Sequence, residues 1–188
     1  CDFIDPSCEN IAQYRLIVVP GLYAASDELL HRLNNYVQQG GHIVYSLRSG
    51  FCDENVKVRA IEQPGIIDKA CGVFYNQFVQ SKGPLKGNPF GVGPEENKVS
   101  NWMELLIPKQ ETKVLAYYDH TYWGKYAAIT QNSYGKGVAT YVGCIPSDSI
   151  VTELIKITVK EAGLWGVDQE IEFPLITRKA INRNGKKI

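Results

Sequence analysis

The chain has 188 residues and a formal net charge of zero, because 20 lysines and arginines balance 20 aspartates and glutamates. That length fits one domain with a sizeable core, and no apolar run approaches the ~20 residues of a membrane span. Nucleic-acid binding needs a basic surface, which this balance does not favour. We therefore expect neither nucleic acid nor a membrane as a partner, and a cytoplasmic location with the periplasm as the alternative.

The segment 14–46 predicts a strand, a helix and a second strand. Residues 16–19 (LIVV) are continuously apolar, as in a strand covered on both faces, and a Pro-Gly pair ends the run. Ser26 is placed to cap the helix through its hydroxyl, and the glycines 40–41 allow the turn that ends it. The apolar face of the helix is formed by Leu29, Leu30, Leu33, Tyr36 and Val37. This order is that of a β-α-β unit in an open parallel sheet, where binding loops follow the strands.

Beyond residue 46, the pattern predicts shorter elements and two loops. A polar loop is expected at 49–55, and a long one at 82–100, where glycines and prolines are frequent. Further strands are predicted at 73–80, 102–107, 113–118, 126–130 and 138–142, and the last two form a β-hairpin. Helices are predicted at 66–71 and 147–162, the second with Ile150, Val151, Leu154, Ile155 and Val159 facing inward.

The cysteines and histidines give no pattern for a metal site. The cysteines are Cys1, Cys8, Cys52, Cys71 and Cys144, and no two of them form a CxxC pair. The histidines, far apart in the sequence and without a zinc motif, are His31, His42 and His120. We expect reduced thiols, with a disulfide between Cys1 and Cys8 left open, and neither a metal nor a cofactor.

Three groups of residues are candidates for chemistry. Cys52 follows a buried strand after a turn, where α/β enzymes present a nucleophile, but Asp53 and Glu54 disfavour the reactive thiolate. These acids, and those at 95–96, are sequence neighbours, which does not suit the ~5 Å carboxyl separation of a retaining glycosidase. The clustered aromatic residues are Trp102, Tyr117, Tyr118, Tyr122, Trp123 and Tyr126. We expect them in a core or an interface, where large apolar area with a polar tip is useful.

Five segments of the sequence resemble a known family in their order and spacing. They are YRLIVVPGLYAAS (14–26), YVQQGGHIVYSLRSGFCDEN (36–55), QPGIIDKACGV (63–73), WMELL (102–106) and LAYYDHTYWGKYAAITQNSYGKGVATYVG (115–143). Together they resemble the middle domain of family 42 glycoside hydrolases, the β-galactosidase trimerisation domain. Residues 82–99 match nothing in the family pattern, and the strand and helix that the family has before the position of Cys1 are expected to be missing.

The resemblance implies a fold and a division of the chain. The fold is α/β, an open and mostly parallel flavodoxin-like sheet like that of class I glutamine amidotransferases, with helices on both faces and a β-hairpin added. Residues 1–163 would form the amidotransferase-like trimerisation domain. Residues 164–188 would be a linker and the first strand of a truncated C-terminal β-domain.

The resemblance also implies a function. The parent protein would be a retaining β-galactosidase acting through two glutamates on a (β/α)₈ barrel, which needs roughly 250 residues and so lies outside this chain. The chain itself would carry no catalytic, cofactor-binding or metal-binding residue. Its partners would be its own copies, in a homotrimer, and the barrel of the same protein. Candidate interface residues are Leu22, Tyr23, Phe51, Tyr122, Trp123 and Tyr126.

Two other functions remain open from the residues alone. One is a stand-alone amidotransferase-like hydrolase, in which Cys52 is the nucleophile and His120 the base. The other is a carbohydrate-binding module that uses the aromatic residues between Trp102 and Tyr126 as a stacking platform.

Overall fold

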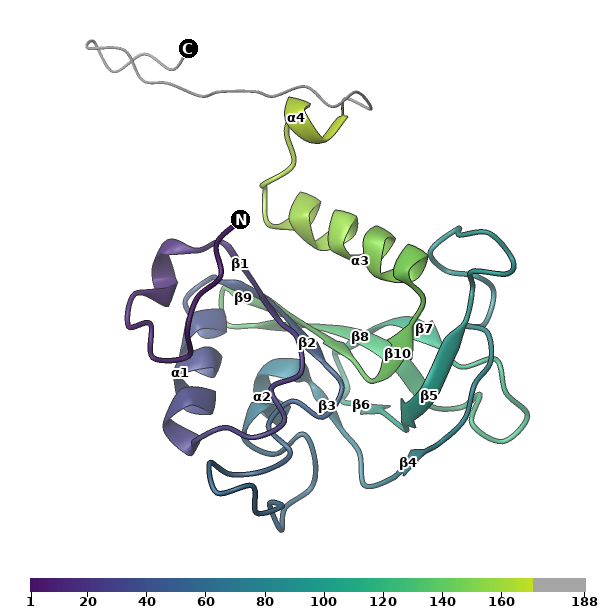
Figure 1. Cartoon of the computed structure of the whole chain (residues 1–188), viewed down its shortest axis with the longest axis horizontal. Helices are drawn as coiled ribbons and strands as arrows, with labels where there is room; N and C mark the ends of the chain where they lie inside the picture. Colours follow the sequence, from purple (N-terminus) through teal and green to yellow (C-terminus); the bar gives the residue numbers. More distant parts are fainter. Residues whose placement is uncertain (171–188) are drawn as a thin grey trace.

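A five-stranded sheet forms the centre of the computed structural model, which describes residues 1–170 (Figure 1). Its strands, in spatial order, are β1 (Leu16–Val19), β2 (His42–Ser46), β9 (Gly137–Val142), β8 (Ala127–Tyr134) and β7 (Lys113–Tyr117). β1, β2 and β9 pair in parallel, while β8 is antiparallel to both β9 and β7. Four strands therefore run in one direction, and the predicted mixed α/β fold with a mostly parallel sheet is confirmed.

The predicted β-α-β unit is present and ends as its residues suggest. Helix α1 (Asp27–Gln38) joins β1 to β2, and the hydroxyl of Ser26 accepts a hydrogen bond from the N–H of Leu29 at 3.2 Å. Gly40 follows the helix with φ of 119°, a conformation that side chains disfavour. Capping and helix ending thus follow from local sequence, as expected.

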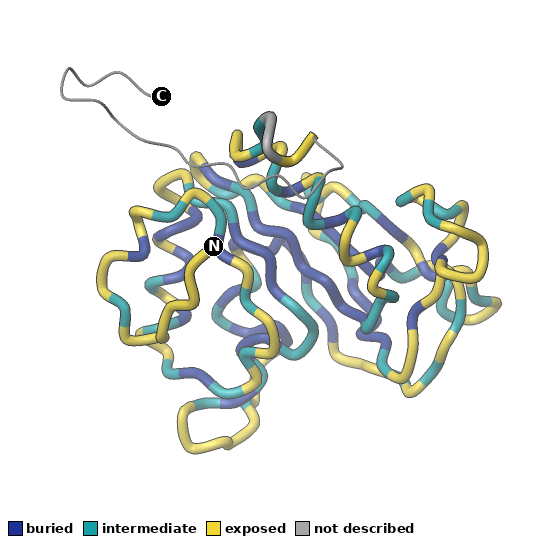
Figure 2. Tube along the Cα trace, turned by 45° about the horizontal axis from the view of Figure 1, so that its top comes forward, coloured by how far each residue is buried: buried dark blue, intermediate teal, exposed yellow. Residues whose placement is uncertain are grey.

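Helices cover both faces of the sheet and create two core clusters. On one face, α1 and the short helices η2 (Gly65–Ile67) and α2 (Asp68–Cys71) pack on Ile43, Tyr45 and Tyr141. On the other face, α3 (Asp148–Glu161) contributes Ile150 and Leu154 to a cluster with Val44. Alternate residues of β2 therefore serve opposite cores, and the central strands are buried while the surrounding loops are exposed (Figure 2).

Three predicted elements differ from the structure. The hairpin is part of the main sheet and not an addition to it, because β9 is nearly all buried and lies between β2 and β8. The predicted strand at 73–80 is two short strands, β3 (Val73–Phe74) and β4 (Phe78–Val79), which pair with different partners: β3 with β6 (Ile107–Pro108), and β4 with β5 (Val99–Glu104). The predicted strand at 102–107 is divided between the end of β5 and the start of β6.

The inward face of the last helix was predicted partly wrongly. Val151 is 41% exposed, and the residues of α3 that are buried are Ile150, Leu154 and Thr158. The remaining elements are η1 (Ile11–Gln13), β10 (Cys144–Pro146), which pairs with β5, and α4 (Val167–Glu170). The predicted strand of a C-terminal β-domain falls in residues 171–188, outside the described residues.

Candidate functional site

The loops that follow β1 and β2 lie side by side at the carboxyl end of the sheet. The N–H of Gly50 donates to the carbonyl of Leu22 at 2.8 Å, and the N–H of Cys52 donates to that of Tyr23 at 2.9 Å. The N–H of Ala25 donates in turn to the carbonyl of Cys52 at 3.2 Å. The two loops therefore form one small backbone ladder, at the end of an open sheet where binding sites usually lie.

An arginine surrounded by aromatic rings is the main feature at this end. The guanidinium carbon of Arg48 lies 4.2 Å from the ring centre of Phe78, 4.6 Å from that of Trp102 and 5.1 Å from that of Phe51. Tyr23 stacks on Phe51 with ring centres 5.6 Å apart. We call Tyr23, Arg48, Phe51, Phe78 and Trp102 the arginine–aromatic cluster. Tyr23 and Phe78 are 38% and 39% exposed, so the cluster presents apolar rings and a cation to solvent.

The buried carboxyl group of Glu104 accepts a hydrogen bond from the backbone of Arg48. The N–H of Arg48 donates to Oε1 of Glu104 at 2.8 Å, and the hydroxyl of Tyr141 donates to Oε2 at 3.0 Å. Arg48 has a φ of 56°, in the left-handed region, so its backbone depends on such contacts. The hydroxyl of Tyr118 donates to the main-chain carbonyl of Glu104 at 2.9 Å. Glu104 itself is 1% exposed.

Burial sets the charge of this carboxyl group. It raises the pKa of Glu104 from its ordinary 4.5 to about 7, against the opposing effects of Tyr75, the Arg48 N–H and Tyr141. The Tyr75 hydroxyl is close enough to affect Glu104, but within residues 1–170 it has no hydrogen bond of good geometry. We therefore treat Tyr75 as a polar neighbour of Glu104 and not as its hydrogen-bond partner.

The turn between β7 and β8 carries a second aromatic group at the same end of the sheet. Nδ1 of His120 accepts hydrogen bonds from the N–H groups of Tyr122, at 3.1 Å, and Trp123, at 3.3 Å. The imidazole stacks on Trp123 with centres 5.8 Å apart. Tyr122 is 73% exposed, whereas Trp123 and Tyr126 pack partly against the core on the α3 side. We call residues 120–126 the aromatic turn.

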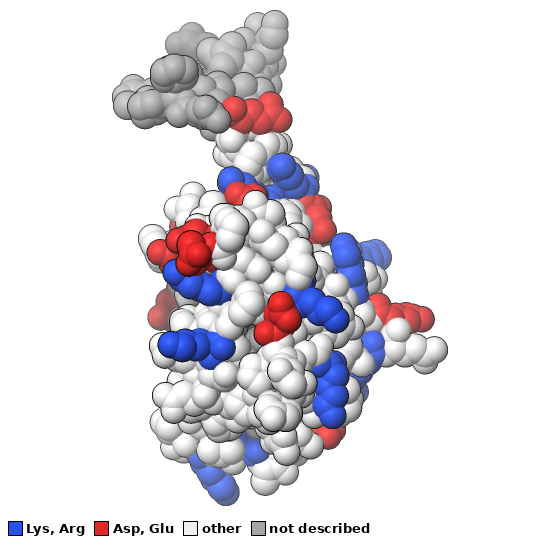
Figure 3. Space-filling model, turned by 90° about the vertical axis from the view of Figure 1, so that its right-hand side faces the viewer, with Lys and Arg blue, Asp and Glu red and all other residues white. Residues whose placement is uncertain are grey.

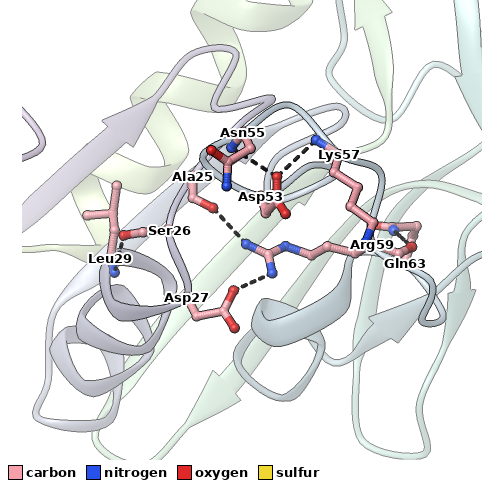
Figure 4. A network of polar contacts seen from close by, with 9 residues as sticks. All are labelled: Ala25, Ser26, Asp27, Leu29, Asp53, Asn55, Lys57, Arg59 and Gln63. Atoms are coloured by element: carbon pink, nitrogen blue, oxygen red, sulfur yellow. Dashed lines mark hydrogen bonds and ion pairs between the residues drawn. The ribbon is translucent and has the colours of Figure 1, made fainter.

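The hydrolase alternative finds little support in this geometry. Cys52 is fully buried, and His120 belongs to a turn separated from the Cys52 loop by β9 and β8 in the strand order. Asp53 accepts hydrogen bonds from the N–H groups of Asn55 and Lys57, both at 2.9 Å, so it closes its own loop (Figure 4). These residues stabilise a loop and do not form a nucleophile–base pair.

Arg59 ties the same loop to the start of α1. Its guanidinium donates to the carbonyl of Ala25 at 2.6 Å and pairs with the carboxylate of Asp27 (Figure 4). The Asp53 loop, the β1 loop and the first turn of α1 are thus one connected unit. The polar residues here have a structural explanation, which leaves the arginine–aromatic cluster as the candidate for binding.

A labelling experiment tests the expected inertness of Cys52. Iodoacetamide should modify Cys52 at neutral pH more slowly than a small model thiol, because the side chain is buried. Cys1 is exposed and serves as the internal comparison. Labelling of Cys52 orders of magnitude faster than Cys1 would restore the hydrolase alternative.

The predicted interface residues separate into two groups. Leu22, Tyr23 and Phe51 lie in the joined loops after β1 and β2, whereas the turn holds Tyr122, Trp123 and Tyr126. Trp102 belongs to the first group, and Tyr118 is fully buried. Sequence reasoning missed Arg48, Phe78 and Glu104. Only Glu104 had a clear signal, since a lone acid within the apolar run WMELL is unusual unless it has a buried role.

Comparison with known proteins identifies the family. The family model described as the β-galactosidase trimerisation domain matches residues 1–165. The chain belongs to this family. Among curated relatives, the β-galactosidase LacZ of Heyndrickxia coagulans is 28% identical over 185 residues, and BgaB of Geobacillus sp. (strain Y412MC61) is 28% identical over 155. These alignments cover 98% and 82% of this chain, but only 27% and 23% of the relatives, so the chain spans about a quarter of their length.

Solved structures give the same result. The trimerisation-domain chain matches a β-galactosidase from Rahnella sp. R3 with a TM-score of 0.76 and 25% identity, over 94% of this chain and 26% of that one. It matches a β-galactosidase from Halorubrum lacusprofundi with a TM-score of 0.74 and 25% identity, over 85% and 24%. The resemblance to the trimerisation domain of family 42 β-galactosidases is confirmed.

The cysteines, the possible metal ligands, the helices and the surface charges of the chain bear on what it binds. All five cysteines, Cys1 and Cys8 included, are free. Within residues 1–170, no three His, Cys, Asp or Glu side chains group as metal ligands. None of the helices in the same residues combines the length and the apolar composition of a membrane span. On the face that Figure 3 shows, the described residues carry scattered charges of both signs, without a continuous basic patch.

Proposed function

We propose that this chain is the non-catalytic oligomerisation domain of a β-galactosidase, which hydrolyses terminal β-galactosides on a barrel outside the chain. The observation that carries the proposal is the match of the trimerisation-domain family to residues 1–165. The buried Cys52 and the structural roles of the loop acids support it, because they leave this end of the sheet without an evident reaction centre. The cytoplasmic location stays a prediction.

The finer description of the fold belongs to the same proposal. Three adjacent parallel strands with helices on both faces are compatible with a flavodoxin-like sheet of the class I glutamine amidotransferase kind. We place the domain end near Gly163, which follows α3 with a φ of 65°. A fold of this type that has lost its nucleophile can persist as a binding scaffold, because function depends on sites and not on the fold itself.

The two aromatic groups are where we place the contacts with neighbouring subunits. A cyclic trimer uses heterologous contacts, in which one patch meets a different patch on the next subunit. The arginine–aromatic cluster and the aromatic turn are two such patches at one end of the sheet. Exposed aromatic rings and arginine are enriched in interface centres. In the full-length enzyme these patches would also lie near the rim of a neighbour's active site.

Alanine variants of the aromatic turn test this placement. In the full-length enzyme, Tyr122→Ala or Trp123→Ala should weaken the trimer by ~2 kcal/mol, or about 30-fold, if either side chain is an anchor. Sedimentation from micromolar to nanomolar concentration measures the change. Val151→Ala is a suitable control, since Val151 is 41% exposed on α3, outside both aromatic groups. Trimers of both variants that persist at nanomolar concentration, like those of the control, would show that the interface lies elsewhere.

Activity of the chain alone separates this proposal from the remaining alternatives. As an isolated domain it should not hydrolyse a chromogenic galactoside, because we assign it no acid–nucleophile pair. The carbohydrate-binding alternative predicts a change in tryptophan fluorescence on adding galactose or lactose. A saturable sugar-dependent change that Trp102→Phe removes would favour that alternative.

A further inference from the structure

The guanidinium group of Arg48 has hydrogen-bond donors that its own chain does not use. The group lies over the rings of Phe78 and Trp102, and such contacts leave the N–H donors in its plane free. Within residues 1–170 it makes no ion pair and no hydrogen bond of good geometry. None of its nitrogens is buried without a partner there, so they reach solvent. The cluster therefore presents a cation that can bind a carboxylate through two N–H groups.

The surrounding structure fixes Arg48 in this position. Its N–H donates to the carboxyl group of Glu104 at 2.8 Å, and its carbonyl accepts from the N–H of Phe51 at 3.3 Å. The N–H groups of Gly50 and Cys52 join the same loop to the loop after β1. An arginine that is already held on aromatic rings loses little further freedom on binding, so its position favours tight contact with a partner.

Asp119, directly before the aromatic turn, carries the opposite charge. It is exposed, and its carboxylate has no ion pair or hydrogen bond of good geometry in the part of the chain that the structure describes. Its N–H donates to the carbonyl of Pro84 at 3.0 Å, which fixes its backbone against the 82–99 segment. It is the only acidic residue between positions 117 and 126. The second aromatic group thus offers one carboxylate from a fixed backbone.

Arg48 and Asp119 are too far apart to pair within one subunit. Arg48 follows β2 and Asp119 follows β7, and both β9 and β8 lie between these strands. Three strand spacings separate the two residues by roughly 14 Å at the carboxyl end of the sheet. Two patches displaced sideways on one end of a subunit suit a heterologous contact, in which the first patch of one copy meets the second patch of the next.

The remaining charges of the two patches are complementary as well. Beside the arginine–aromatic cluster, Asp53 binds N–H groups of its own loop, whereas Glu54 is exposed and makes no ion pair within residues 1–170. On the aromatic turn, Lys125 is exposed, with its ammonium 5.1 Å from the ring centre of Tyr126. Each patch therefore carries one cation and one free acid. Contact between unlike patches can pair all four charges, while contact between two copies of the cluster would bring two arginines together.

We propose that the guanidinium of Arg48 in one subunit binds the carboxylate of Asp119 in the next subunit. A second copy of this chain is then the occupant of the arginine–aromatic cluster. The inference rests on the oligomerisation function proposed above, and it adds the contact that decides which patches meet. The rings around Arg48 keep water from the pair, which strengthens a hydrogen bond between charged groups.

Sedimentation of the full-length enzyme from micromolar to nanomolar concentration tests the pair. Arg48→Gln and Asp119→Asn should each raise the dissociation constant of the trimer at least about 10-fold, because each leaves one charge without its partner. The double variant should stay within about 3-fold of the more affected single variant, since one interaction cannot be lost twice. Glu111→Gln and Lys136→Gln are the controls, because they remove an exposed acid and an exposed cation at the opposite end of the sheet.

Asp119→Lys keeps the test decisive if Arg48→Gln does not fold. Asp119 is exposed, so lysine fits there, and it should weaken the trimer more than asparagine because it meets the arginine with a like charge.

Three results would each overturn the proposed pair: single variants that assemble like the controls, losses that multiply in the double variant, or Asp119→Lys no weaker than Asp119→Asn. A parent enzyme that is monomeric throughout would overturn the proposed oligomerisation function together with the pair. A trimeric parent that gives any of the three results would overturn the pair alone, so the two failures are distinguishable.

Discussion

Replacing Glu104 with alanine should destabilise the domain by about 3 kcal/mol or more at pH 6. The substitution leaves the N–H of Arg48 and the hydroxyl of Tyr141 without their acceptor, and each buried unsatisfied group costs roughly 1–3 kcal/mol. It also leaves a cavity beside Tyr75. Urea unfolding followed by circular dichroism measures the loss as a shift in the denaturation midpoint.

Glutamine at the same position is the matched control. It keeps an oxygen that can accept from Arg48 and has no charge to bury, so Glu104→Gln should fold. The parent chain loses stability as pH rises from about 4.5 to 7, because folding favours the protonated acid whose pKa burial raises to about 7. That loss is about 3 kcal/mol when complete. At pH 8 the glutamine variant should therefore equal or exceed the parent chain in stability, and alanine at or above glutamine would contradict the assigned bonds.

Replacing Gly137 with alanine should lower the melting temperature by about 10 °C. The start of β9 passes so close to the end of α1 that an added Cβ would overlap the carbonyl oxygens of Val37 and Gly41. Backbone atoms cannot move aside as a flexible side chain can, so we expect a loss of about 3 kcal/mol. In a domain of this size each kcal/mol shifts the melting temperature by about 2–4 °C.

Gly83→Ala provides the comparison for this prediction. An added Cβ there meets only the carbonyl oxygen of Asp119 at 3.8 Å, an ordinary contact distance. Its cost should stay within about 0.5 kcal/mol. Differential scanning calorimetry measures the melting temperatures of both variants. Equal melting temperatures would mean that β9 and α1 are not as close as the structure places them.

Much of the fold could be predicted because its causes are local. The apolar run 16–19, the cap at Ser26 and the glycines at 40–41 each act within one turn or strand, and each predicted its element. The predicted elements were wrong where a segment pairs with strands far away in the sequence. The run 73–80 alternates like one strand, yet it is divided between partners at Ile107 and Glu104, which are far along the chain.

The candidate site shows the same division between local and distant causes. Parallel strands predicted that the loops after β1 and β2 would share one end of the sheet, and they do. The role of Arg48 could not be predicted from the sequence, where it is one charged residue in a polar loop. That role depends on contacts with aromatic rings of β4 and β5. Val151 was wrongly predicted to face inward. Helical spacing identifies the apolar face of a helix, but it does not tell how wide a strip of that face is buried by the neighbouring elements.

The α/β class, the β-α-β unit and the family of the chain could be predicted from the sequence, because they depend on patterns of neighbouring residues. The central position of β9 in the sheet, the burial of Glu104 against Arg48 and the division of the exposed rings into two groups became known from the folded structure. They could not be predicted, because burial and hydrogen-bond partners depend on residues brought together from distant parts of the chain. Glu104 lies between apolar residues in the sequence. Its pKa is raised, and its carboxyl group binds the N–H of Arg48, only when β2, β5 and β9 have packed around it.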